Sequence, residues 1–369
     1  MKPLIRARID ADALRHNLRR LRALAPRSRV MAVVKANAYG HGLQETARTL
    51  QEADALAVAR LEEGVLLREA GVRSRIVLLE GVLDAAQLAE AARRGFELVV
   101  HDAEQIALLQ EWRGDPAFEL WLKVDSGMNR LGFRPERALV AWERLRALRP
   151  RALRLMTHLA GADDPEGGSV ALQTARFQPL REQLNARALA AGVSLEVSIA
   201  NSAAVLGLPA LHADWIRPGL ALYGVSPFVG MTGARHGLRP AMRLEAAVIA
   251  LRDVPSGETV GYSGRWRAQR PTRLAILAAG YGDGLLRSFP DGAPVLLQGR
   301  RAPLAGRVSM DMIAVDVTDL PPVRLGDAAE IWGPELPVEE LAASAGTIPW
   351  ELLCAVSQRV PLAHDPQLV

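Results

Sequence analysis

The stretch that decides the fold is VMAVVKANAYGHG, residues 30–42, in which an apolar run ends at a lysine. Residues 30–34 are all apolar, and small or turn-forming residues follow Lys35. This pattern is typical of a buried strand that leads into a loop. Lysine is also rare in the chain, because only three of the 45 lysine and arginine residues are lysines: Lys2, Lys35 and Lys123.

The two internal lysines, Lys35 and Lys123, each stand at the end of an apolar, strand-like run. Arginine keeps its proton in proteins and cannot form an imine with an aldehyde. A lysine retained at the end of a strand is therefore a candidate for nucleophilic amine chemistry. The alternative is a lysine whose stem packs on the strand while its amine reaches solvent.

Length and composition indicate a soluble globular protein with one large and one smaller domain. The chain has 369 residues, of which 49% are hydrophobic and 23% charged, enough for a sizeable core. The net charge of +4 is spread along the chain without a basic block, which argues against nucleic acid as a partner. The single cysteine, Cys354, rules out an internal disulfide and fits a reducing compartment. The charged start and the lack of a membrane-length apolar run predict a cytoplasmic protein without membrane association.

Eight short apolar runs alternate with helical patterns in the first two thirds of the chain. The strand candidates are residues 30–35, 55–59, 76–79, 97–100, 118–124, 153–157, 195–199 and 214–217. Eight such strands are the number that closes a parallel (β/α)₈ barrel, which we expect over residues 1–235. An open, doubly wound sheet is the alternative. Beyond it, closely spaced strand patterns predict a mainly β domain over residues 236–369, called the β domain below.

In a parallel barrel, functional groups gather at the C-terminal ends of the strands. Lys35, Lys123 and His158 each end or directly follow a predicted strand. Ser202 and Gly219 follow the last two strands, where this fold usually binds phosphate. Each residue also has a plainer interpretation: His158 as a structural histidine and Ser202 as a helix cap.

All four tyrosines have a glycine neighbour, which favours loops where the backbone can approach a ligand. They are Tyr39, Tyr223, Tyr262 and Tyr281. The seven histidines show no metal-ligand spacing, and there is no cysteine pair, so no metal site is predicted.

Eight motifs occur in the order found in alanine racemases, the barrel-type enzymes that use pyridoxal 5′-phosphate (PLP). They are AVVKANAYGHG, KVDSGMNRLGF, THLA, ANSAA, WIRPGLALYG, VGYSG, GYGDG and GRVSMDM. The chain resembles this family over nearly its whole length. The resemblance implies a barrel, a following β domain with which residues 1–9 pair, and a homodimer with shared active sites.

Position by position, the resemblance implies roles for individual residues. Lys35 corresponds to the lysine that holds PLP, and Tyr262 to a second acid–base supplied by the other subunit. Arg217 corresponds to the arginine that faces the pyridine nitrogen, and His158 to its neighbour. The phosphate contacts correspond to Tyr39, Ser202, Gly219 and Leu220, and Asn201 is a further cofactor-binding residue.

The remaining correspondences concern the substrate. Arg130 and the backbone of Met310 match groups that hold its carboxylate, and Lys123 matches a lysine often found carbamylated. Asp311 and Tyr281 match the lining of the entrance. The resemblance implies interconversion of L- and D-alanine by two bases on opposite faces of Cα, supplying D-alanine for cell-wall peptidoglycan.

Two departures from the family pattern affect specificity. Gln358 stands where several relatives have tyrosine, and Ser309 where many have cysteine. A smaller, more polar wall at Gln358 would admit serine as well as alanine, so a broad-specificity racemase is an alternative. A related class of barrels decarboxylates diamino acids, but GYGDG and SMDM resemble the racemase branch. A non-enzymatic PLP carrier is a further alternative, and Tyr262 in the β domain argues against it.

Overall fold

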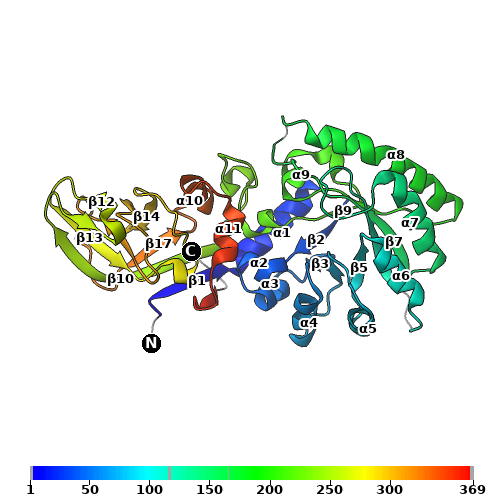
Figure 1. Cartoon of the computed structure of the whole chain (residues 1–369), viewed down its shortest axis with the longest axis horizontal. Helices are drawn as coiled ribbons and strands as arrows, with labels where there is room; N and C mark the ends of the chain where they lie inside the picture. Colours follow the sequence, from blue (N-terminus) through cyan, green and yellow to red (C-terminus); the bar gives the residue numbers. More distant parts are fainter. Residues whose placement is uncertain (1–2, 115–117, 165, 366–369) are drawn as a thin grey trace.

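The computed structural model describes residues 3–114, 118–164 and 166–365 and has two parts, a closed barrel and a mainly β region beside it (Figure 1). Residues 1–2 and 366–369, at the two ends of the predicted domains, lie outside the described residues. The predicted fold class, a parallel barrel followed by a mainly β domain, is confirmed.

Eight parallel strands close the barrel, with the last strand hydrogen-bonded to the first. They are β2 (Arg29–Val33), β3 (Ala55–Val58), β4 (Ile76–Leu78), β5 (Glu97–Val100), β6 (Glu119–Lys123), β7 (Ala152–Met156), β8 (Val197–Ser198) and β9 (Trp215–Ile216). Nearly every residue of these strands is buried, because side chains fill the barrel on one face and helices cover the other.

Helices follow the strands and form the outer layer of the barrel (Figure 1). They are α3 (Leu43–Thr49), α4 (Leu61–Glu69), α5 (Ala85–Arg94), α6 (Ala103–Glu111), α7 (Pro135–Ala147), α8 (Ser169–Ala190) and α9 (Ser202–Gly207), with α1 (Ala11–Leu24) preceding β2. Short 3₁₀ turns η1 (Pro209–Leu211), η2 (Leu220–Tyr223) and η3 (Gly233–His236) continue the chain towards the β domain. None of the described helices is long and apolar enough to cross a membrane.

The β domain is built on a long strand, β10 (Met242–Val254), which pairs antiparallel with three others: β1 (Ile5–Asp10), β13 (Thr272–Leu277) and β17 (Ala328–Trp332). The N-terminal strand β1 thus joins the sheet of the C-terminal region. The other strands are β11 (Thr259–Val260), β12 (Trp266–Arg267), β14 (Pro294–Leu297), β15 (Arg300–Pro303), β16 (Ile313–Asp316) and β18 (Leu362–Asp365). The helical segments are η4 (Tyr262–Gly264), η5 (Tyr281–Asp283), α10 (Val338–Ser344) and α11 (Pro349–Ala355).

Paired charges close the N-terminal end of the barrel. Arg154 donates to Glu196 at 2.5 Å and to Glu119 at 2.8 Å. Arg75 donates to Glu97 at 2.6 Å and also to Glu119 at 2.8 Å. Two buried indoles complete the network, since Trp121 donates to Glu97 and Trp215 to Glu196. With Arg29, which pairs with Glu196, three arginines meet three glutamates, so the charges of this network balance.

Candidate functional site

Lys35 begins an unusual backbone segment, α2 (Lys35–Tyr39), at the C-terminal end of β2. Ala36, Asn37, Ala38 and Tyr39 all have positive φ, between 51° and 54°, so this turn is left-handed. A left-handed residue other than glycine costs about 1–2 kcal/mol, and such strain persists only where surrounding contacts impose it. The sequence predicted a loop here, and the left-handed turn is a finding of the structure.

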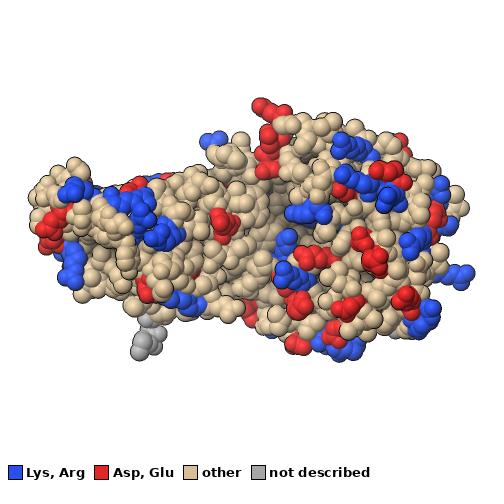
Figure 2. Space-filling view, viewed as in Figure 1, with Lys and Arg blue, Asp and Glu red and all other residues tan. Residues whose placement is uncertain are grey.

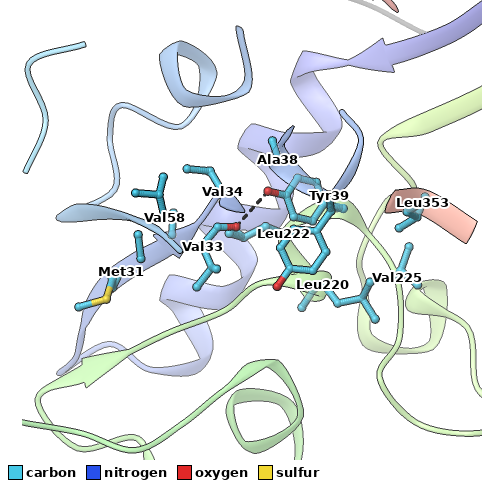
Figure 3. Close-up of a cluster of buried hydrophobic side chains, with 14 of the residues drawn as sticks. Met31, Val33, Val34, Ala38, Tyr39, Val58, Leu220, Leu222, Val225 and Leu353 are labelled. Atoms are coloured by element: carbon cyan, nitrogen blue, oxygen red, sulfur yellow. Dashed lines mark hydrogen bonds between the residues drawn. The ribbon is translucent and has the colours of Figure 1, made fainter. Parts of the chain in front are cut away.

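Three contacts with residues outside the turn hold it in place. Glu63, in α4, accepts a hydrogen bond from the Ala36 N–H at 2.7 Å. The Asn37 side chain accepts one from the Leu43 N–H at 2.9 Å. At the far end, Gly40 packs so closely against α11 that a Cβ would lie 2.0 Å from the Leu353 carbonyl oxygen. Figure 3 shows Tyr39 and Ala38 in the buried cluster that includes Leu353. The direction of the Lys35 side chain therefore depends on both domains.

Arg217 follows β9 and is buried beside His158. Its Nη1 donates to Ser198 Oγ at 2.6 Å, and its Nη2 donates to the Thr157 carbonyl at 2.6 Å. Nη2 also lies 3.3 Å from His158 Nδ1. A guanidinium can only donate, so Nδ1 accepts and any proton of the neutral ring is on Nε2. Burial lowers the pKa of Arg217 to about 10, and burial together with the Arg217 charge holds the pKa of His158 well below its usual value.

Lys123 ends β6 and faces the same set of cations. Its pKa is lowered to about 8, first by burial and then by the charges of Arg217, Arg130 and Lys35. Asp125 is the acid that opposes this effect, and its carboxylate is occupied by backbone N–H groups of its own loop at 3.0 Å. Lys123, Arg130 and His158 line one small pocket. The C-terminal end of the barrel therefore carries an excess of positive charge, and basic side chains border the hollowed centre of the face in Figure 2.

The predicted phosphate contacts converge where α9 and η2 begin. Asn201 caps α9 by accepting from the Ala204 N–H at 3.1 Å. Ser202 Oγ accepts from the Gly219 N–H at 2.9 Å and the Ala221 N–H at 3.2 Å. These two bonds use both lone pairs of the hydroxyl, so its own hydrogen is left to donate.

Tyr39 reaches the same place from α2. A Cβ on Gly219 would lie 2.4 Å from the Tyr39 hydroxyl, so only glycine leaves room for this approach. Leu220 is buried in the cluster that also surrounds Tyr39 (Figure 3). The structure thus brings Tyr39, Ser202 and Gly219 together and places Asn201 and Leu220 beside them.

Four predicted residues lie on the β domain. The Tyr281 N–H donates to the Ser309 carbonyl, and the Gly282 N–H donates to the Met310 carbonyl at 2.8 Å. Arg359 holds this pair of segments together, since it donates to buried Asp283 at 2.8 Å and to Asp311 at 2.6 Å. Gln358, next to Arg359, is exposed. Tyr281, Met310 and Asp311 therefore form one exposed group on the β domain.

Tyr262 lies away from the barrel, in a turn whose Gly261 is close to the backbone of Arg307. It begins η4, between β11 and β12, and 66% of its surface is exposed. Figure 1 places β12 at the end of the β domain that points away from the barrel. Within one chain, Tyr262 is not brought to Lys35.

Sequence reasoning missed Glu63 and Arg359, which position site segments without belonging to a predicted motif. Glu63 carried a weak signal, because a glutamate three residues into a helix often binds backbone N–H groups at its start. Among the described residues, no three His, Cys, Asp or Glu side chains gather as they do in a metal site.

The sequence matches two family models, the alanine racemase N-terminal domain over residues 9–227 and the alanine racemase C-terminal domain over residues 241–364. The chain belongs to the alanine racemase family. An alanine racemase from Shewanella sediminis is 46% identical over 371 residues, covering 99% of this chain and 100% of the relative.

Solved structures of the family are also similar. The biosynthetic alanine racemase from Pseudomonas aeruginosa has a TM-score of 0.93 at 44% identity and covers 99% of this chain and 100% of its own. The alanine racemase from Bartonella henselae with covalently bound pyridoxal phosphate has a TM-score of 0.86 at 30% identity, with the same coverage.

Proposed function

We propose that this protein is a PLP-dependent racemase that interconverts L- and D-alanine and supplies D-alanine for peptidoglycan in the cytoplasm. The observation that carries the proposal is the gathering of Lys35, Lys123, Arg130 and Arg217 at one end of the barrel. An excess of cations at a partly buried site suits a ligand with a phosphate and a substrate with a carboxylate.

The residues present fit PLP. The Ser202 hydroxyl and the Tyr39 hydroxyl would hold the phosphate, together with the backbone at Gly219 and Leu220. The Gly219 N–H is bound by Ser202 Oγ, whereas the Leu220 N–H, at the start of η2, has no acceptor among the described residues. Asn201 would fix the start of α9 there. Lys35 would hold the cofactor covalently.

Arg217 would face the pyridine nitrogen. Its hydrogen bonds to described residues use Nη1 and Nη2, which leaves the Nε hydrogen for a ligand. With a pKa of about 10 it stays charged at neutral pH, so it donates to that nitrogen and does not protonate it. When bound, PLP withdraws electrons from the substrate and makes its Cα proton acidic.

Racemisation then requires a base on each face of Cα. Lys35 would move the proton on one face. Tyr262 of the partner subunit would act on the other, since within its own chain Tyr262 is exposed and remote from the barrel. The charge of Arg217 would favour the anionic form of that tyrosine, and the neutral His158 ring, held by Arg217 through Nδ1, would have its Nε2 hydrogen left to donate.

Arg130 and the backbone at Met310 would hold the substrate carboxylate, and Tyr281 with Asp311 would line the entrance. Carbamylation of Lys123 would turn a cation into an anion that pairs with Arg130. The reaction with carbon dioxide needs the neutral amine, and a pKa of about 8 provides a substantial neutral fraction near neutral pH.

The direct test incubates the purified holoprotein with L-alanine and measures D-alanine by a stereospecific assay. We expect conversion to a racemic mixture, with L-serine as a comparison substrate because of Gln358. Absence of D-alanine formation would identify the protein as a binder or as an enzyme for another substrate.

The shared site is tested by mixing inactive Lys35→Ala and Tyr262→Phe proteins under conditions that exchange subunits. In a mixed dimer one site combines the intact Lys35 of one chain with the intact Tyr262 of the other. Random assortment makes half of the dimers mixed, so roughly a quarter of wild-type activity should return. No recovery, with exchange shown independently, would place Tyr262 outside the partner's site.

A further inference from the structure

A small cavity lies where the barrel meets the β domain, directly behind the left-handed turn that carries Lys35. It is lined by His41 and Tyr223 from the barrel, and by Trp332 and Glu339 from the β domain. Its volume of about 10 Å³ is close to the smallest space that holds one water molecule. A water also requires two to four polar partners, so the polar atoms of these side chains decide whether one binds.

His41 directs a hydrogen-bond acceptor to this region. Its ring is fully buried and stacks on Tyr223 with the centroids 4.5 Å apart. Nδ1 lies 2.9 Å from the Tyr39 carbonyl oxygen and 3.1 Å from that of Ala38. Carbonyl oxygens only accept, so Nδ1 carries the proton and donates. Burial lowers the pKa of His41 to about 4, so the ring is neutral and Nε2 is a bare acceptor.

The His41 Nε2 atom is buried and has no partner among the described residues. The same holds for the indole Nε1 of Trp332, a side chain with only 1% exposure at the end of β17. One atom is an acceptor and the other a donor, and both residues line the same cavity. Leaving both unpaired would carry the full desolvation penalty of each polar group.

Glu339, in α10, also lines the cavity, and its carboxylate is engaged by backbone groups. One carboxylate oxygen accepts from the Ser226 N–H and the Gly233 N–H, both at 2.9 Å. The unpaired polar atoms are therefore those of His41 and Trp332, one acceptor and one donor. They are the complement of one water molecule that accepts from Trp332 and donates to His41.

We propose that one ordered water binds between His41 and Trp332 and fixes the left-handed turn of Lys35 to the β domain. Trp332 donates to the water oxygen, and the water donates to His41 Nε2. The restraint reaches Lys35 through His41, because its Nδ1 holds the carbonyl groups of Ala38 and Tyr39 in the turn. His41 and Trp332 are thereby positioning residues for Lys35.

The water is tested by a high-resolution crystal structure of the holoenzyme. We expect one well-ordered peak at about 2.7–3.2 Å from His41 Nε2 and from Trp332 Nε1. Ordered side chains around the cavity without a peak between them would overturn the proposal. This result does not depend on activity, so the water site and the proposed function can fail separately.

The positioning role, which rests on the proposed function, is tested with Trp332→Phe. This variant keeps a buried ring and removes the donor. Trp142→Phe is the matched control, since Trp142 in α7 is 3% exposed and its Nε1 also has no partner among the described residues. We expect Trp332→Phe to lower kcat about three- to tenfold, the effect of one hydrogen bond, with KM for alanine changed less than about twofold. A kcat equal to that of Trp142→Phe would overturn the positioning role.

Discussion

The two ends of the barrel use charge in opposite ways. At the N-terminal end, hydrogen bonds to Glu196 and Glu119 raise the pKa of Arg154 against the effect of its burial. Hydrogen bonds from Trp215, Arg154 and Arg29 lower the pKa of Glu196 to about 2 despite its partial burial. At the C-terminal end, burial and then the charges of Arg217, Arg130 and Lys35 lower the pKa of Lys123 to about 8. The first arrangement is complete within the protein, and the second needs an anion from outside.

The N-terminal end of the barrel therefore contributes mainly to stability, and the C-terminal end mainly to ligand binding. Charges that are mutually paired keep the barrel closed, whereas unpaired cations destabilise the empty chain and favour an anionic ligand. The strained turn at Lys35 belongs to the same end of the barrel. Substitutions at the N-terminal end should therefore lower the free energy of unfolding, whereas substitutions at the C-terminal end should lower activity with little loss of stability.

The largest effect is expected from Lys35→Arg, which keeps the charge but removes the amine that can bind an aldehyde. Racemisation should fall by about 10³-fold or more, the scale of losing a catalytic acid–base. Thermal unfolding of the cofactor-free protein should stay close to wild type, because Lys35 contributes no paired charge to the fold. Residual activity within tenfold of wild type would remove Lys35 from the centre of the mechanism.

At the opposite end, Glu196→Gln should destabilise the protein by about 1.5–3 kcal/mol, because it removes the charge that pairs with Arg154 and Arg29, while Arg154 keeps Glu119 and Glu97. KM for alanine should not change. The control is Glu143→Gln, in which a surface glutamate also loses two arginines, Arg146 and Arg187, at an expected cost below about 1 kcal/mol. Equal losses in denaturant unfolding of the two variants would contradict the proposed importance of the closed network.

The effect of Glu196 should also depend on pH. Its folded-state pKa of about 2 lies below the unfolded value near 4.3, so its contribution is present above the unfolded value and is lost as pH falls towards 2. The difference in stability between wild type and Glu196→Gln should shrink over that interval. A difference that stays constant down to pH 2 would assign the loss to packing.

A smaller effect of opposite sign is expected from Lys123→Gln in the cofactor-free protein. The folded-state pKa of about 8 lies below the unfolded value near 10.4, so the charged amine lowers stability at pH 7 and this penalty disappears as pH rises from 8 to 10.4. Removing the charge should stabilise the protein by about 1–2 kcal/mol at pH 7, less than the shift implies because the amine is partly exposed. Lys123→Arg keeps the charge and should give no gain; a gain there as well would point to packing.

The strands of the barrel could be predicted from the sequence. The eight barrel strands fall within about two or three residues of the predicted runs, because strands buried on both faces are continuous apolar runs. The short strands β11, β12, β15 and β18 were missed, since two to four residues carry little periodicity.

The geometry around Lys35 could not be predicted. Alanine has no preference for left-handed backbone, so Ala36 and Ala38 give no signal of it. The turn is imposed by Glu63 and by the α11 carbonyl of Leu353, both remote in sequence. The charge network at the other end escaped notice for the same reason, because Arg75, Glu119 and Glu196 meet only once the barrel closes.

The central claim is that the unpaired cations at the C-terminal end bind PLP through Lys35. The most direct measurement reduces the holoprotein with borohydride, digests it and maps the cofactor mass by peptide mass spectrometry. Lys123 serves as an internal comparison, since its amine lies in the same cluster and has a lowered pKa. The account predicts the label on the peptide that contains Lys35 and none on the peptide that contains Lys123. A label on Lys123, or no label in a preparation with visible cofactor absorbance, would contradict it.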